Sequence, residues 1–136
     1  MKTTLKPTLL ILITFFLLFE ANAQNMVGLS KSDIQKKMAS DFPKFETNAF
    51  GISTNISTLK YVDKNDRTLI FYFGKDNKCE YSKMIEDMDV LQKRITEFNS
   101  KYKPNGDLKW IENTRGKNFN IKIEKEEYIF NIIISE

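Results

Sequence analysis

Turn-forming residues gather at four places in the chain, and their spacing constrains the fold more than any other feature of the sequence. The clusters occupy residues 63–66, 74–78, 113–116 and 124–127 and are rich in Asp, Asn, Gly or charged side chains. The segments that they enclose, residues 67–73 and 117–123, have the length of a strand rather than of a helix. Because tight turns connect antiparallel strands, this spacing predicts an antiparallel sheet.

Six segments have the composition or the alternation of β-strands. Residues 67–73 are rich in β-branched and aromatic side chains, and residues 118–124 alternate polar with apolar positions. Residues 44–56 have no clear period, and we expect a loop there that leads into the first strand. The predicted strands cover residues 59–61, 67–73, 79–81, 108–111, 119–124 and 128–135.

Two segments have the spacing of amphipathic helices. The first covers residues 31–41, because Ser30 is a favourable N-cap and Pro43 stops the helix. The second covers residues 84–102, where apolar side chains recur in alternating steps of four and three: Met84, Met88, Leu91, Ile95, Phe98 and Tyr102. Its predicted first turn carries acids that complement the helix dipole: Glu86, Asp87 and Asp89.

The order of these elements is α-β-β-β-α-β-β-β, which suggests two α-β-β-β units. We therefore predict an α+β fold with an antiparallel sheet of about six strands and two helices on one face. The predicted strand at residues 67–73 is apolar on both sides, with Ile70 and Tyr72 opposite the core side. The last strand likewise places Ile129 and Ile133 there.

These four residues, Ile70, Tyr72, Ile129 and Ile133, form a candidate interaction face. An apolar patch that stays exposed is typical of a partner, a ligand groove or a dimer interface. The alternative is that the strands are central ones whose second side is covered by residues 44–56, since strands buried on both sides are apolar throughout. The sequence leaves both interpretations open.

The amino terminus has the three parts of a secretory signal. Two lysines precede an apolar run at residues 9–19, and Ala21-Asn22-Ala23 offers a cleavage site before Gln24. The run is shorter than the ~20 residues that a spanning helix needs. We therefore expect residues 1–23 to be a signal peptide and residues 24–136 to be a single α+β domain, exported to the periplasm or beyond the cell, soluble after cleavage and without a stable membrane anchor.

The residues that are missing exclude several kinds of chemistry. The chain has no histidine and one cysteine, so it can form neither Ser-His-Asp nor Cys-His catalytic sites and no internal disulfide. We predict no catalytic residues, no metal site and no cofactor. The net charge of +3 is close to neutral and gives no reason to expect a nucleic-acid partner.

Cys79 is a candidate reactive thiol. The nearby Lys78 and Lys83 are cations of the kind that activate a thiolate, but a free cysteine more often behaves as a small buried apolar side chain. A buried structural thiol is therefore the favoured interpretation.

One short segment resembles a known kind of module. Residues 28–34 (GLSKSDI) resemble the opening of the helix-and-hairpin modules in BamE-type envelope proteins and β-lactamase-inhibitor-like proteins. BamE-type proteins are lipoproteins, whereas this chain has no lipid-bearing cysteine near residue 24. The resemblance covers seven residues and assigns no functional residue.

Three hypotheses for the function remain. The first is an exported, non-enzymatic binding or interaction protein, whose partner is a protein, an apolar ligand or a second copy of the chain. The second is a hydrolase or lyase without metal that relies on carboxylates and lysines, with Glu80, Tyr81, Glu112 and Glu124 as candidate members. The third is a structural component of the cell envelope.

Overall fold

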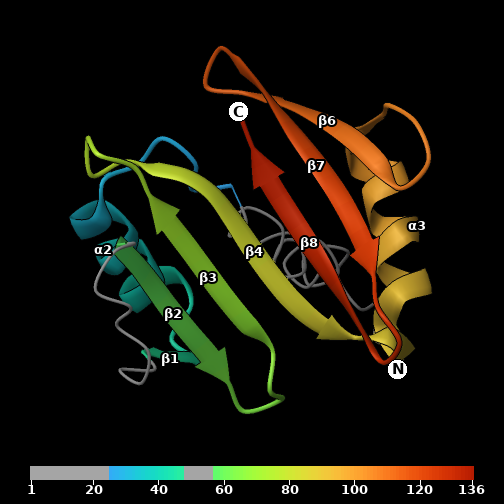
Figure 1. The fold of residues 1–136 in the computed structure, drawn as a ribbon, viewed down its shortest axis with the longest axis horizontal. Helices are drawn as coiled ribbons and strands as arrows, with labels where there is room; N and C mark the ends of the chain where they lie inside the picture. The colour runs from blue at the N-terminus through green and yellow to red at the C-terminus, as the bar shows by residue number, and fades with distance from the viewer. Residues whose placement is uncertain (1–24, 48–56) are drawn as a thin grey trace, which may run out of the picture.

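The structure is a computed structural model that describes residues 25–47 and 57–136. The predicted signal peptide, and most of the loop expected at residues 44–56, lie outside these residues. Within these two ranges, two α-helices, a 3-10 turn and eight strands follow one another (Figure 1). They are α2 (Lys31–Asp41), β1 (Phe45–Thr47), β2 (Ser57–Asp63), β3 (Thr68–Phe73), β4 (Cys79–Asp87), η1 (Met88–Val90), α3 (Leu91–Lys101), β5 (Lys103–Pro104), β6 (Lys109–Thr114), β7 (Lys117–Lys125) and β8 (Ile129–Ser135).

The first helix has the predicted bounds. The Ser30 side chain accepts a hydrogen bond from the Asp33 backbone N–H at 3.2 Å and donates one to its carboxylate at 2.7 Å. These bonds satisfy one of the free N–H groups that every helix has at its start. The helix ends before Pro43, as expected, and it buries Ile34 and Met38 in the core.

The second helix is shorter than predicted. Residues 84–87 belong to β4, and α3 begins only at Leu91 after the turn η1. Met84 fits the helical spacing, but it pairs with Leu69 of β3 and with Ile132 of β8. Pairing on both sides of the strand satisfies its backbone groups and buries Met84, so tertiary contacts override the local pattern.

The described strands form one antiparallel sheet of eight strands, in the order β1-β2-β3-β4-β8-β7-β6-β5. The prediction of about six strands was wrong because β1 and β5, at the two edges, are too short to produce a sequence pattern. The α+β class, the antiparallel pairing and the two helices are confirmed. The placement of both helices on one face stays a prediction.

The strand order has an internal symmetry. Each half of the chain is a helix followed by four strands, and the last strands of the two halves, β4 and β8, pair at the centre of the sheet (Figure 1). Seven residue pairs join these two strands, from Tyr81–Ser135 to Asp87–Ile129. The predicted division into two similar units is thus seen in the described residues, with one more strand in each unit than expected.

One face of the sheet carries the hydrophobic core. Alternate residues of β3, β7 and β8 are buried there, and cross-strand pairing lines them up in rows. The buried members from these three strands are Leu69, Phe71, Phe73, Phe119, Ile121, Ile123, Phe130, Ile132 and Ile134. Helix α3 packs on this face, because the ring of Phe98 meets that of Trp110 at 5.2 Å and Trp110 donates a 2.8 Å hydrogen bond to Asn99.

Charged side chains on the same face tie α3 to the sheet. Glu86 of β4 is buried and accepts two hydrogen bonds from Arg94, at 2.6 and 2.9 Å. Arg94 also pairs with Glu97 at 2.6 Å. A second arginine, Arg67, also approaches Glu86. Its guanidinium group lies 3.9 Å from the Glu86 carboxylate and 2.7 Å from the carboxylate of the buried Asp63. The two arginines thus neutralise two buried carboxylates, which would otherwise be costly to remove from water.

Candidate interaction surface

On the other face of the sheet two adjacent rows of side chains cross the strands, because directly paired residues of neighbouring strands point to the same side. The first, which we call the lysine row, contains Lys60, Ile70, Lys83, Ile133, Lys122 and Lys109. The second, the tyrosine row, contains Thr58, Tyr72, Tyr81, Ser135, Asn120, Ile111 and Lys103. Together these two rows make the lysine–tyrosine face, and every member is half-buried or exposed. A third row beside them contains Val62, Thr68, Ile85, Asn131 and Glu124.

Two neighbouring tyrosines of the tyrosine row stack on each other. The rings of Tyr72 and Tyr81 lie 4.2 Å apart, with 13° between their planes, and Tyr81 is 37 % exposed. Partial burial raises the pKa of Tyr81, and the neighbouring Tyr72 and Glu80 raise it further. Its hydroxyl is therefore uncharged at neutral pH and can both donate and accept a hydrogen bond.

The structure brings three of the four predicted face residues together. Ile70 and Ile133 flank Lys83 in the lysine row, and Tyr72 lies in the adjacent row. Ile129 is on the same side but pairs with Asp87, and the buried Asn131 separates it from Ile133. All four predicted residues are half-buried.

Sequence reasoning missed the residues of β4 that lie between them. Tyr81 and Lys83 occupy the centre of the face, yet the predicted strand ended at residue 81 and a helix was expected from residue 84. The alternation of Ser82, Met84 and Glu86 as buried positions in β4 was the available signal. It is weak because two of these three residues are polar.

Few lysines of the lysine–tyrosine face form ion pairs with carboxylates of the described residues. Lys122 forms an ion pair of 2.6 Å with Glu124. Among the described residues, no carboxylate forms an ion pair with the other lysines of the two rows, which are Lys60, Lys83, Lys103 and Lys109. The face is therefore both apolar and positively charged.

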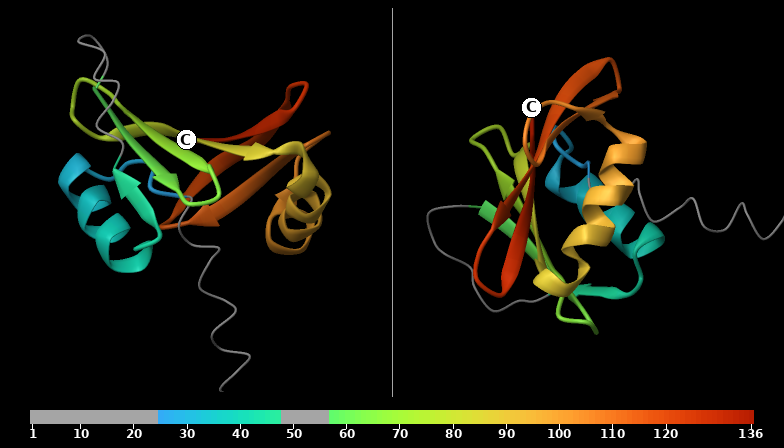
Figure 2. Two further views of the ribbon diagram at one scale, coloured as in Figure 1. Left: turned by 90° about the horizontal axis from the view of Figure 1, so that it is seen from below. Right: turned by 90° about the vertical axis from the view of Figure 1, so that its right-hand side faces the viewer.

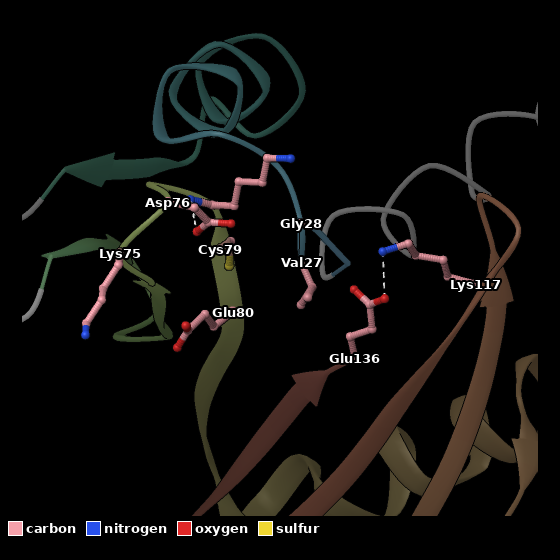
Figure 3. A pocket seen from close by; sticks show the side chains of 9 residues that line it. Val27, Gly28, Lys75, Asp76, Cys79, Glu80, Lys117 and Glu136 are labelled. Carbon is pink, nitrogen blue, oxygen red and sulfur yellow. Dashed lines mark hydrogen bonds and ion pairs between the residues drawn. The ribbon is translucent and has the colours of Figure 1, made fainter.

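Cys79 lies beside an open cavity of about 680 Å³ (Figure 3). The residue is only 2 % exposed, and its thiol donates a hydrogen bond of 3.4 Å to the Tyr81 carbonyl oxygen. Burial raises the pKa of Cys79 to about 12, so the thiol is protonated at neutral pH. These observations favour a structural thiol over a reactive one.

The other residues of this cavity are mostly charged and come from several segments: Val27, Gly28, Lys75, Asp76, Lys78, Glu80, Lys117 and Glu136. Two of the charges neutralise each other, since Lys117 and Glu136 form an ion pair of 2.6 Å (Figure 3). Among the described residues there is no cluster of three or more acidic or cysteine ligands that could hold a metal ion. The cavity thus has a charged rim.

The carboxylates of the hydrolase hypothesis occupy different places. Glu80 lines the cavity near Cys79, whereas Glu112 lines a second cavity of about 480 Å³ with Tyr102. Glu112 also accepts a hydrogen bond from the Asn25 side chain. Glu124 lines neither cavity and pairs with Lys122. Among the described residues, the three carboxylates thus lie at separate places.

Within the described ranges, neither helix has the length and apolar character needed to cross a bilayer. No protein-family model, curated protein or solved structure matches this chain, so the candidate surface is defined by its own residues alone.

Proposed function

We propose that this protein is an exported, non-enzymatic interaction protein that binds its partner on the lysine–tyrosine face. In this proposal residues 1–23 direct export and both helices cover the opposite face of the sheet. The observation that supports the proposal is the pair Tyr72 and Tyr81, which stack on each other next to the row that carries Ile70 and Ile133 instead of in the core. Aromatic residues surrounded by apolar contacts are the usual energetic centres of protein interfaces.

The shape of the sheet also favours binding on this face. The left view of Figure 2 shows that the sheet is strongly twisted, so that neither of its faces is flat. The short edge strands β1 and β5 are poor places for strand-to-strand association, which leaves the face as the larger surface.

Site-specific photocrosslinking tests this function. A benzoylphenylalanine is placed at Tyr81 and, as a matched control, at Tyr128, which is 74 % exposed but lies in the turn before β8. After irradiation in the fraction to which the protein is exported, adducts should form from position 81 and not from position 128. Light scattering of the purified protein then separates self-association from binding to another molecule.

Two results would contradict the proposal. One is the absence of adducts at position 81, and the other is an equal yield of the same adducts at both positions. If the crosslinked species is a dimer of this chain, and light scattering reports the same dimer, the partner is a second copy.

A further inference from the structure

Lys83 is the most unusual residue of the lysine–tyrosine face. It lies in a central strand, half-buried, and is paired across the sheet with Ile70 on one side and Ile133 on the other. Lysine can cover apolar neighbours with its methylene stem while its ammonium group stays in water. No carboxylate of the described residues forms an ion pair with that ammonium group, so its charge is available to a partner.

Two other lysines of the row stand at regular intervals from Lys83, although Lys122 is exposed and forms an ion pair with Glu124. Lys60, Lys83 and Lys122 stand on alternate strands, and neighbouring strands are about 4.8 Å apart. Their backbones are therefore spaced by roughly 10 Å, with an isoleucine between each two. Such a row is complementary to a surface on which acidic and apolar side chains also alternate.

Three features favour a protein over other anionic partners. The isoleucines and tyrosines offer apolar contacts that a charged polysaccharide would leave unused. The twisted sheet does not present the plane that a bilayer surface would require (Figure 2). One side of the Tyr81 ring is already stacked against Tyr72, which leaves less ring surface for a nucleic-acid base.

We infer that the partner is an acidic protein segment that carries apolar side chains, and that it lies across the lysine row. This inference rests on the proposed function and specifies the chemistry of the partner. The lysines provide attraction that depends on ionic strength, and the isoleucines and the tyrosine pair provide contact that does not.

The test uses two dye-labelled polymers, poly-glutamate and a random copolymer of glutamate and tyrosine, with binding followed by fluorescence anisotropy. The copolymer should bind the protein more tightly than poly-glutamate, because it supplies both charge and aromatic rings. The double variant Lys60→Met, Lys83→Met should weaken copolymer binding about tenfold at low salt. The matched control, Lys36→Met with Lys93→Met, removes two exposed lysines from the helices and should change binding less than about twofold.

Vesicles that contain phosphatidylglycerol and an oligothymidylate serve as competing anionic probes. If either binds in a manner that depends on Lys60 and Lys83 while the copolymer does not, the inferred class of partner is wrong but the face is still a binding surface. Equal losses in the face variant and the helix control would also overturn the inference. The crosslinking at position 81 remains a separate readout, so the proposed function can stand when this inference fails.

Discussion

Both faces of the sheet carry apolar side chains, but they differ in whether the charged side chains among them form ion pairs. On the core face Glu86 is buried and held by Arg94, and the buried Asp63 is held by Arg67. On the lysine–tyrosine face Lys83 lies between two isoleucines without an ion pair from the described residues. The two faces therefore share the alternation of apolar residues but differ, at these positions, in whether a charged side chain has an opposite charge beside it.

The largest expected difference between the faces concerns two adjacent residues of β3. Phe71 is fully buried on the core face, whereas Tyr72 is half-buried on the other. Replacement of Phe71 by Ala should lower the free energy of unfolding by about 3–5 kcal/mol, because it leaves a cavity. Replacement of Tyr72 by Ala should cost about 1 kcal/mol, since water can fill the space.

Urea denaturation followed by circular dichroism measures both values. If Phe71→Ala does not fold, the milder Phe71→Leu should still cost more than Tyr72→Ala. Equal costs for residues 71 and 72 would show that both faces are buried in the folded protein and would remove the distinction between them.

The second expected effect concerns the buried carboxylate of Glu86. The variant Glu86→Gln keeps the size of the side chain but leaves Arg94 without its main counter-charge. We expect a loss of about 3 kcal/mol in the free energy of unfolding, because Arg94 then keeps only the Glu97 carboxylate as a counter-charge in a poorly solvated place. The matched control is Glu124→Gln, which breaks the exposed pair with Lys122 and should cost less than about 1 kcal/mol.

A cost for Glu86→Gln as small as that for Glu124→Gln would contradict this picture. It would mean that the Glu86–Arg94 pair is hydrated and does not tie α3 to the sheet. The same denaturation assay distinguishes the two results.

The sequence predicts the local features of this fold well. The first helix could be placed because Ser30 and Pro43 lie at its two ends and act through nearby backbone groups. The strand β7 could be placed because Phe119, Ile121 and Ile123 alternate with polar residues in a strand buried on one side. In both elements the information is local, so no knowledge of distant neighbours was needed.

The features that were not predicted correctly depend on residues that are distant in the sequence. The spacing of Met84, Met88 and Leu91 suits a helix as well as a strand that runs into one, and only the pairing of β4 with β3 and β8 decides between them. For the same reason the lysine row could not be predicted. Lys60, Lys83 and Lys122 come from three strands, and their alignment depends on a register that the sequence does not display.

The third expected effect is a pH dependence that arises on the core face. Burial alone would raise the pKa of Asp63, but hydrogen bonds from the Arg67 side chain and from the backbone N–H groups of Asn65 and Arg67 lower it below its usual value. The unfolded chain therefore binds a proton more readily than the folded one, and stability rises with pH in this range. The contribution of Asp63 is present above its unfolded pKa and is lost as the pH falls through the folded one.

Asp63→Asn should remove this part of the pH dependence. Urea denaturation of the wild type and of this variant between about pH 5 and about pH 3 should show a smaller acid loss in the variant. The control Asp41→Asn alters an exposed carboxylate and should leave the acid loss unchanged. An unaltered acid loss in Asp63→Asn would show that Asp63 does not contribute to it.

The smallest expected effect is the one that most sharpens the comparison. Lys83→Met removes the central charge of the lysine–tyrosine face and keeps an unbranched side chain of similar length. If the lysine serves a partner and not the fold, the free energy of unfolding should change by less than about 0.5 kcal/mol, as for most surface substitutions. Lys36→Met on α2 is the control for the loss of one exposed charge.

A loss of about 2 kcal/mol or more for Lys83→Met alone would place this lysine among the groups that hold the fold together. Lys83 would then stabilise the fold, as the charged residues of the core face do. Its position would no longer support a binding surface. An unchanged or slightly higher stability, together with weaker binding of the acidic copolymer, would instead indicate that Lys83 serves binding and not folding. Removal of Lys83 would then cost the protein contact with its partner and nothing in folding, as expected for a charge retained for recognition.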